Sequence, residues 1–333
     1  MSRALDTAKS QQSNSGPTPP FVAGKNKIIN GALDIWQRGT SFTAGGYAAD
    51  RWRISNGAGN TVSFSQQLFT GATIPSAGYE YQYFARIQRT VSVADTYLLN
   101  RQEDVRTLAG QTVTLSFWAK SSSSFTINPT DMYLYQYFGD GGSGANTVSI
   151  NTSPVTFGTS WNRYTFTFNT SSVISQTITT RNFFEIAIKL VAAIGNFTLD
   201  IWGMQLEAGS IATPFTKAAG TIQGELAACQ RYYYRSQPGS NGYARVASGR
   251  ATSTTNLDLM IPLPSPMRVP PTSVEYSTLI TTTANHPSSI VLTQSTTTTA
   301  VCDFTTTGIT TDRFYQVMGN NSTSAYIGFS AEL

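Results

Sequence analysis

The hydrophobic residues of this chain recur with a period of two, and this pattern constrains the fold more than any other feature. Successive side chains of a β-strand point to opposite faces, so alternation of apolar and polar residues marks a strand with one face on a core. The alternation occurs in residues 112–119, 132–138, 164–169, 184–190, 197–202 and 256–261. Segments rich in glycine and serine, such as residues 139–144, separate these runs. We therefore predict an all-β chain of two antiparallel, jelly-roll-like β-sandwich modules joined by a short helix.

Length and local composition divide the chain into four parts. Its 333 residues exceed what one ordinary hydrophobic core needs, which favours two domains. Residues 1–25 are polar and contain a proline cluster, which predicts an extended N-terminal arm. All five tryptophans lie within residues 26–216, whereas residues 236–333 are rich in threonine and proline. We predict a β-sandwich at 26–216, a connecting helix at 217–235 and a smaller β-sandwich at 236–333.

The connecting helix is inferred from Ile222, Leu226, Cys229 and Tyr233, which are spaced by four, three and four residues. Gly224 weakens such a helix by roughly 1 kcal/mol relative to alanine. A helix this short is marginal alone. We expect it to pack between the two modules or against copies of itself on a symmetry axis.

Charge and cysteine content argue against several classes of function. Charged residues make up 12% of the chain, the net charge is +4 and Lys and Arg form no run, so we expect no nucleic-acid partner. No apolar run approaches the roughly 20 residues of a membrane span, so we expect no membrane insertion. The first twenty residues lack the apolar segment of a signal peptide. Cys229 and Cys302 are too few for a disulfide framework, and we expect both to be reduced.

Residues typical of catalytic centres are scarce. His286 is the only histidine, and it lies in a turn-like stretch without a nucleophile elbow elsewhere in the chain. Paired carboxylates remain the enzymatic alternative, because glycoside hydrolases place two acids about 5 to 10 Å apart. Asp131 and Asp140, which flank a tyrosine-rich strand, are the candidate pair. On balance we expect no catalytic centre, no cofactor and no metal site.

Aromatic residues carry the binding hypothesis, because their rings stack on the apolar faces of sugars and phenol hydroxyls reach sugar hydroxyls. The candidate glycan-binding residues are Tyr133, Tyr135 and Tyr137 on one face of a predicted strand, Tyr81 and Tyr83 in a similar series, and Trp118, which alternation places opposite the core face of its strand. The alternative is that these rings belong to the core or to a subunit interface, where tyrosine is also enriched.

Four segments carry a resemblance to a known family. Residues 26–42 read N-K-I-I-N-G-A-L-D-I-W-Q-R-G-T-S-F, and residues 49–52 read A-D-R-W. Residues 205–215 read Q-L-E-A-G-S-I-A-T-P-F and lead into E-L-A-A-C-Q-R-Y-Y at 225–233. The pattern resembles β-rich modules of tail-fibre and receptor-binding proteins of tailed bacteriophages. The resemblance covers about two thirds of the chain.

The resemblance implies a virion structural protein, made in the host cytoplasm, that binds host surface glycan without turnover. The first module would then be similar to carbohydrate-binding modules, and the chain would form a homotrimer attached to tail or baseplate proteins. The attachment residues would lie in the N-terminal arm, at Pro17, Pro19, Pro20 and Phe21. The alternatives are a purely architectural neck, baseplate or capsid-decoration protein without a ligand, and a polysaccharide depolymerase.

We expect the tryptophans and charged residues of the motifs to stabilise the fold. We expect Trp36 and Trp52 to fill the core, and Arg38 and Arg51 to bridge to Asp34 and Asp50 or to cap exposed carbonyls. A further possibility is that Asp50, Asp200 and Glu207 contribute oxygens to a structural calcium ion, although the chain has no loop with a dense acidic calcium signature.

Overall fold

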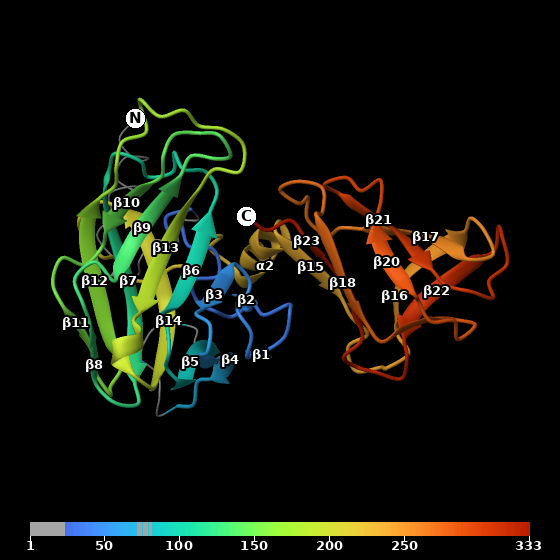
Figure 1. The fold of residues 1–333 in the computed structure, drawn as a ribbon, viewed down its shortest axis with the longest axis horizontal. Coiled ribbons are helices and arrows are strands. Elements are labelled where there is room, and N and C mark those ends of the chain that lie inside the picture. The colour runs from blue at the N-terminus through green and yellow to red at the C-terminus, as the bar shows by residue number, and fades with distance from the viewer. Residues whose placement is uncertain (1–23, 72–74, 76–78, 80–81) are drawn as a thin grey trace, which may run out of the picture.

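The computed structural model describes residues 24–71, 75, 79 and 82–333. In this part of the chain the fold is all-β, with two β-sandwich modules side by side and one short α-helix between them (Figure 1). The predicted fold class is therefore confirmed. The described residues contain no helix that is both long and apolar enough to cross a lipid bilayer. The expected attachment arm, with Pro17, Pro19, Pro20 and Phe21, lies almost entirely outside the described residues.

Two six-stranded antiparallel sheets face each other in the first module. The first sheet has the order β1 (Ser41–Phe42), β4 (Thr61–Leu68), β5 (Tyr83–Val91), β14 (Phe197–Ala208), β7 (Thr112–Ser121), β12 (Asn162–Asn169). The second has the order β10 (Asn146–Ser149), β9 (Met132–Tyr137), β13 (Phe183–Leu190), β6 (Thr96–Gln102), β3 (Trp52–Asn56), β2 (Gly46–Tyr47). A small pair, β8 (Phe125–Ile127) and β11 (Val155–Phe157), and a 3-10 turn, η1 (Ala192–Ile194), complete this module.

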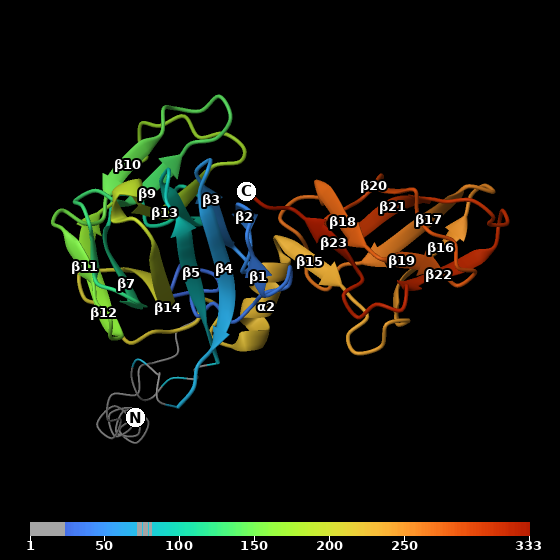
Figure 2. The same ribbon diagram turned by 60° about the horizontal axis from the view of Figure 1, so that its bottom comes forward.

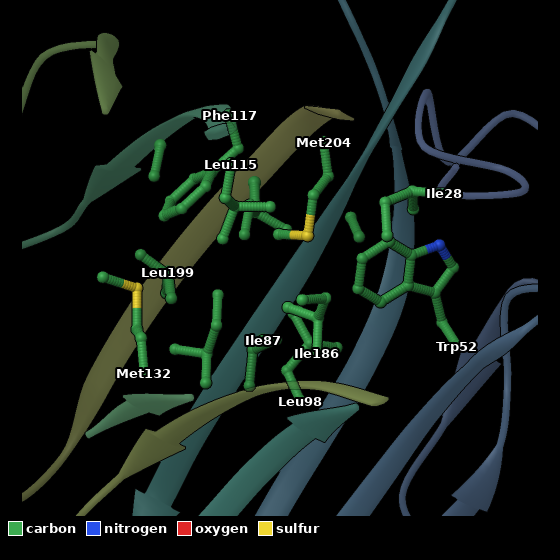
Figure 3. Close-up of a cluster of buried hydrophobic side chains, with 14 of the residues drawn as sticks. Ile28, Trp52, Ile87, Leu98, Leu115, Phe117, Met132, Ile186, Leu199 and Met204 are labelled. Carbon is green, nitrogen blue, oxygen red and sulfur yellow. The ribbon is translucent and has the colours of Figure 1, made fainter. Parts of the chain in front are cut away.

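The space between these sheets holds the main core (Figure 3). Leu115 and Phe117 point inward from β7, and Leu98 and Ile186 point toward them from the facing sheet. Full burial of each such side chain contributes roughly 1.5–3 kcal/mol. Trp52 closes one end of this core and is 1% exposed, as expected for a motif tryptophan that fills space.

The strands β7 and β14 are buried on both faces, which the alternation did not predict. Thr114 and Ser116, on the face of β7 away from the main core, are both 0% exposed. A second aromatic cluster covers this outer face; it comprises Ala32, Phe69, Phe84, Trp118, Trp202 and Phe215, with Tyr79 and Trp161 packed against them. The chain after β14 folds back over the sheet to supply Phe215, because the amide of Thr216 donates to Gln205 Oε1 at 2.8 Å.

The connecting helix is shorter than predicted and presents a different face. It is α2, Ile222–Gln230, whereas the spacing predicted residues 217–235. Ile222 and Leu226, expected on the packed face, are 42% and 37% exposed, and the buried residues are Glu225 and Cys229. Tyr233 lies beyond the helix in strand β15.

The buried carboxylate of Glu225 explains why α2 turns this face inward. Its Oε1 accepts a hydrogen bond from the amide of Asn30 at 2.5 Å, and its Oε2 accepts one from the amide of Ala219 at 2.9 Å. Burial raises the pKa of Glu225, and these two amides oppose that effect. The helix is thus fastened to the motif segment of the first module.

The second module is a smaller sandwich, seen to the right in Figure 2. Its three-stranded sheet has the order β15 (Tyr233–Ser236), β23 (Tyr326–Ser330), β18 (Ser273–Ser277). Its six-stranded sheet has the order β19 (Leu279–Thr281), β22 (Phe314–Gly319), β16 (Arg245–Ala251), β17 (Asn256–Pro262), β21 (Thr299–Thr305), β20 (Ser289–Leu292). Its separate core contains Leu259, Cys302 and Phe329. The first strand begins at Tyr233, three residues before the predicted module boundary at 236.

Asn26, the first residue of the first motif segment, forms four side-chain hydrogen bonds. Its Nδ2 donates to the carbonyls of Met204 and Thr216, both at 3.0 Å. Its Oδ1 accepts from the amides of Ile28 at 2.9 Å and Leu206 at 3.1 Å. This buried amide therefore ties the first motif segment to β14, about 180 residues later in the chain.

The side-chain amide of Asn30 joins the two motif segments 26–42 and 49–52 to each other. Its Nδ2 donates to the carbonyls of Ile35 and Asp50, both at 2.9 Å, and its Oδ1 accepts from the amide of Ile35 at 3.1 Å. The indole of Trp52 donates to the carbonyl of Asn30 at 2.9 Å. Segments 26–42 and 49–52 are thus one connected structure.

A buried ionic cluster joins the two modules. Arg51 is 0% exposed and pairs with Glu332, and Arg38 Nη2 lies 3.3 Å from Glu332 Oε1. Each guanidinium also stacks on a ring: Arg51 lies 3.5 Å from the centroid of Tyr232, and Arg38 lies 3.5 Å from that of Tyr233. We name Arg38, Arg51 and Glu332 the interdomain clasp.

The expected bridges to motif aspartates are formed only in part. Arg38 Nη1 lies 3.9 Å from Asp50 Oδ1, and Gln37 Nε2 donates to Asp50 Oδ2 at 2.5 Å. Asp34 instead lies 3.5 Å from Lys217. Burial raises the pKa of Asp50 to about 7, although Arg38 and Gln37 favour its charged form. The principal anion of the clasp is therefore Glu332, which belongs to the other end of the chain.

The chain leaves the first module through α2 and β15 and returns to it after β23. The amide of Ala331 donates to the carbonyl of Tyr232 at 2.7 Å, which holds the outgoing and returning segments together. The carbonyl of Leu333 then accepts from Arg101 Nη1 at 2.9 Å and from Tyr47 at 3.2 Å. The last residues consequently lie against the outer face of the sheet that contains β6.

Candidate functional site

The outer face of the sheet β10-β9-β13-β6-β3-β2 carries the predicted tyrosine series. Met132 and Leu134 point into the core, so the alternating residues Tyr133, Tyr135 and Tyr137 point outward and are half-buried. The face is turned toward the viewer in Figure 1. The strand pairing places these tyrosines beside the outward residues of β13.

Cross-strand pairing assembles an aromatic surface around Phe183. Tyr137 is directly opposite Phe183 in the register, with ring centroids 5.1 Å apart and planes inclined by 37°. The ring of Tyr135 lies 6.3 Å from that of Phe183. Arg101 Cζ lies 4.4 Å from the Phe183 centroid on its other side. Contacts of this kind hold three rings and one guanidinium in fixed positions.

Two ion pairs border this aromatic surface. Arg101 Nε donates to Glu185 Oε2 at 2.5 Å, and the two residues are cross-strand neighbours in β6 and β13. Arg181 Nη1 donates to Asp140 Oδ2 at 3.2 Å across the loop at the end of β9. The first pair is largely buried and the second is exposed.

The pKa values of the Tyr133 and Tyr137 phenols are both raised. Burial, and then the nearby carboxylate of Glu185, raise the pKa of Tyr133 to about 12. Tyr137 donates its hydroxyl proton to Asp140 Oδ1 at 2.7 Å, and this hydrogen bond raises its pKa. The Tyr133 hydroxyl can therefore donate as well as accept a hydrogen bond, whereas the Tyr137 proton goes to Asp140 and its oxygen is left to accept.

A hollow of about 290 Å³ lies among these groups. It is lined by Arg101, Tyr135, Tyr137, Asp140, Arg181, Phe183 and Leu333. Six of these residues come from the first module and Leu333 comes from the end of the second. The volume is at the small end of the roughly 300–1,000 Å³ typical of ligand sites. We name these seven residues the tyrosine hollow.

The structure separates the predicted candidates into several groups. Tyr135 and Tyr137 line the tyrosine hollow, and Tyr133 lies on the same sheet face beyond it. Tyr83 is at the start of β5 in the opposite sheet. Tyr81 lies outside the described residues.

Trp118 is not an exposed platform, which corrects that part of the prediction. Alternation correctly placed it opposite the main core, but it is only 5% exposed. Its ring lies 5.2 Å from that of Trp202 and 5.6 Å from that of Tyr79, and Arg163 Cζ lies 4.7 Å from its centroid. It belongs to the second aromatic cluster because residues after β14 cover the outer face of β7.

Asp131 and Asp140 do not form the paired carboxylates of the depolymerase alternative. They lie beyond opposite ends of β9, a six-residue strand and therefore about 20 Å long. Asp131 is buried and accepts from the amide of Asn128 at 2.8 Å, whereas Asp140 is exposed at the tyrosine hollow. Hydrolysis of a glycosidic bond requires a separation of roughly 5–10 Å, so this pair is unsuited to it.

The proposed calcium carboxylates are also separated. Asp200 accepts from Arg86 Nε at 2.7 Å and Glu207 accepts from the hydroxyl of Thr213 at 2.6 Å, while Asp50 lies at the clasp. Within the described residues no three His, Cys, Asp or Glu side chains are grouped as a metal site. These carboxylates stabilise loops and strand pairs of the protein itself.

A second hollow, of about 250 Å³, lies on the outer face of the second module. It is lined by Arg245, Val246, Ala247, Ser248, Met260, Ile261, Pro262 and Gln316. No aromatic ring contributes to it, so it offers no stacking surface for a sugar. The tyrosine hollow is the better candidate for this chemistry.

The sequence did not indicate Arg101, Arg181, Phe183 or Leu333 as site residues. Phe183 was detectable in principle, because the alternation of residues 184–190 extends back to it. The two arginines and Leu333 had no comparable signal, since strand order and the returning chain bring them to the hollow.

Comparisons with known proteins identify similar folds at low similarity. No protein-family model matches the sequence, and no curated protein sequence matches it. A solved structure of the enzymatically active domain of tailspike protein 4 from bacteriophage CBA120 aligns at 13% identity and a TM-score of 0.34, over 56% of this chain and 22% of that chain. The present chain thus corresponds to about a fifth of that tailspike domain.

Two smaller proteins align along nearly their whole length. A putative sugar-binding protein from Bacteroides thetaiotaomicron is 13% identical, with a TM-score of 0.35, and the alignment covers 55% of this chain and 100% of that chain. A family 11 carbohydrate-binding module from Clostridium thermocellum is 14% identical, with a TM-score of 0.32 and coverage of 52% and 98%. Similarity at this level does not establish what the present chain binds.

Proposed function

We propose that this chain is a structural component of a tailed-phage particle that binds host surface glycan at the tyrosine hollow. One observation carries the glycan-binding part: Tyr135, Tyr137 and Phe183 present rings beside hydrogen-bonding groups that are already oriented. Sugar recognition needs this combination, because a pyranose has apolar faces and a rim of hydroxyls. The motifs at 26–42, 49–52 and 205–215 support the phage assignment through their resemblance to tail-fibre modules.

In this proposal the protein acts as a homotrimer, with the N-terminal arm attached to tail or baseplate proteins of the virion. A single hollow of this size would bind sugar weakly, and several copies on one particle would raise the overall avidity by 10²–10⁴. Sedimentation of the full chain tests the trimer. Deletion of residues 1–23 tests the attachment, because particles that incorporate the truncated chain normally would contradict it.

Glycan binding is tested by titrating immobilised host surface polysaccharide with the wild-type chain and with Tyr135→Ala and Tyr137→Ala. Stacking and the phenol hydrogen bond are lost together, so each substitution should weaken binding about tenfold or more. Tyr243→Ala is the matched control, since Tyr243 is 46% exposed in the second module and lies outside the hollow. Binding that is equally strong in all four proteins would exclude the tyrosine hollow.

The two alternative functions give different results in the same experiment. An architectural protein would bind none of the host polysaccharides, and the tyrosine substitutions would have no measurable effect. A depolymerase would release reducing ends from purified capsule, and this release would saturate with substrate concentration. The separation of Asp131 from Asp140 removes the carboxylate pair that the sequence suggested for such an enzyme.

A further inference from the structure

The charged groups of the tyrosine hollow are already compensated by one another. Arg101 and Arg181 line the hollow as cations, and Asp140 lines it as an anion. Glu185 supplies a second anion directly behind Arg101. The four charges sum to zero, and each guanidinium has a carboxylate partner within 3.2 Å.

This pairing disfavours an anionic ligand. The carboxylate of an acidic sugar would have to displace Glu185 from Arg101 or Asp140 from Arg181 to gain a counter-charge. The Arg101–Glu185 pair is the harder to open, because Glu185 has a side chain only 8% exposed and would be left buried without its cation. An anion placed without such displacement would approach two carboxylates, and like charges repel.

The same groups suit a neutral sugar. Hydroxyls donate and accept, so they can bond simultaneously to the remaining lone pairs of Asp140 and to free N–H groups of Arg181. On the aromatic side of the hollow, the phenol of Tyr135 can donate and accept, and the phenol of Tyr137, whose proton goes to Asp140, can accept. An uncharged sugar can therefore form hydrogen bonds with the groups that line the tyrosine hollow while both ion pairs stay intact.

We infer that the tyrosine hollow selects neutral glycan segments, and that its two ion pairs exclude uronic and sialic acids. This inference rests on the proposed glycan-binding function and adds the chemical class of the ligand. Glu185 and Asp140 are then the specificity-determining residues, because each neutralises an arginine that would otherwise pair with the carboxylate of an acidic sugar.

The test uses the full chain and two sets of polymers, neutral mannan, galactan and glucan, and acidic polyuronate and polysialate. Binding is measured at 50 and 500 mM NaCl. The wild-type chain should bind a neutral polymer with less than about a twofold change across this range, because no ionic contact to the ligand is screened. It should bind the acidic polymers at least about tenfold more weakly.

Two substitutions should weaken this preference by removing the carboxylate partner of a cation. Glu185→Gln removes the partner of Arg101, and Asp140→Asn removes that of Arg181, so each should gain about tenfold in affinity for an acidic polymer, and that gain should vanish at 500 mM NaCl. Asp140 is exposed, so Asp140→Asn should fold normally even where the more buried Glu185→Gln does not. Arg53→Gln is the control: it removes a cation of the same sheet, on β3, that does not line the hollow.

The outcomes distinguish the inferred selectivity for neutral glycans from the proposed glycan binding itself. Salt-insensitive binding of a neutral polymer, with the gain in each variant that folds, supports the inference. Wild-type binding confined to acidic polymers and abolished by salt overturns the inference and leaves glycan binding intact. Failure of the wild type to bind any neutral or acidic polymer overturns both.

Discussion

Replacing Glu332 with glutamine removes one negative charge from the interdomain clasp and keeps the shape of the side chain. The side chains of Arg51 and Arg38 are 0% and 8% exposed, so both cations would stay buried without their principal counter-charge. Breaking a buried ion pair in this way costs about 3–5 kcal/mol. Arg51 keeps its contact with the ring of Tyr232, at 3.5 Å, which is worth up to about 2 kcal/mol when desolvated. We therefore expect a loss near the lower limit, about 3 kcal/mol.

The distribution of tryptophans makes the effect visible in two signals. All five lie within residues 26–216, so their fluorescence reports on the first module alone, while far-ultraviolet circular dichroism reports on both modules. In urea the two signals should change together in the wild type and separate in Glu332→Gln, because the clasp couples the modules. The melting temperature should fall by on the order of 6–12 °C.

Asp312→Asn provides the matched control for this experiment. It also removes a carboxylate from an arginine, Arg250, at 3.5 Å, but these side chains are 75% and 57% exposed. An exposed pair contributes about 0–1 kcal/mol. If Glu332→Gln were no more destabilising than Asp312→Asn, the clasp could not be what joins the modules.

Three further predictions address stability. Because burial raises the pKa of Asp50 from 3.8 to about 7, the folded chain binds a proton that the unfolded chain has lost between about pH 4 and 7. The free energy of unfolding should thus fall as pH rises through this window, by on the order of 4 kcal/mol from this residue. Urea titrations should show a shallower pH dependence for Asp50→Asn than for the wild type. Equal slopes would contradict the raised pKa of Asp50. Trp118→Ala should cost about 3–5 kcal/mol in urea unfolding and leave glycan affinity unchanged, whereas lost affinity in a folded variant would return Trp118 to the binding site. Gly31→Ala should cost about 1–3 kcal/mol, because a Cβ there would lie 2.1 Å from the carbonyl oxygen of Met204, and an unchanged melting temperature would contradict this packing.

Local periodicity predicted six of the strands, β7, β9, β12, β13, β14 and β17, together with their inward faces. Leu115 and Phe117 point into the core, and Tyr135 and Tyr137 point out of it, as the alternation of β7 and β9 requires. The physical reason is that successive side chains of a strand point to opposite faces, so the order of residues alone determines which of them share a face. The same pattern does not specify what covers the outer face of a strand. Trp118 was for that reason placed among the candidate glycan-binding residues, although the second aromatic cluster buries it.

Long-range pairing could not be predicted from a single sequence. Arg51 and Glu332 are 281 positions apart, and neither has a neighbour that identifies its partner. The apolar spacing of α2 was misleading for a related reason: amides of Asn30 and Ala219 satisfy Glu225, so a charged residue occupies the buried face. The sequence analysis named two rings of the tyrosine hollow, Tyr135 and Tyr137, but it did not predict the ion pairs Arg101–Glu185 and Arg181–Asp140.

The outgoing strand β15 and the returning strand β23 are antiparallel neighbours, and both continue into the first module through Tyr232 and Ala331. The second module is therefore suspended from two chain crossings instead of one. A single crossing would allow it to swivel, whereas two crossings fastened by the clasp resist torsion. Tension applied to the far tip would be shared between both crossings. The tyrosine hollow, which takes Leu333 from the returning chain, would thus keep its full lining while the second module is pulled.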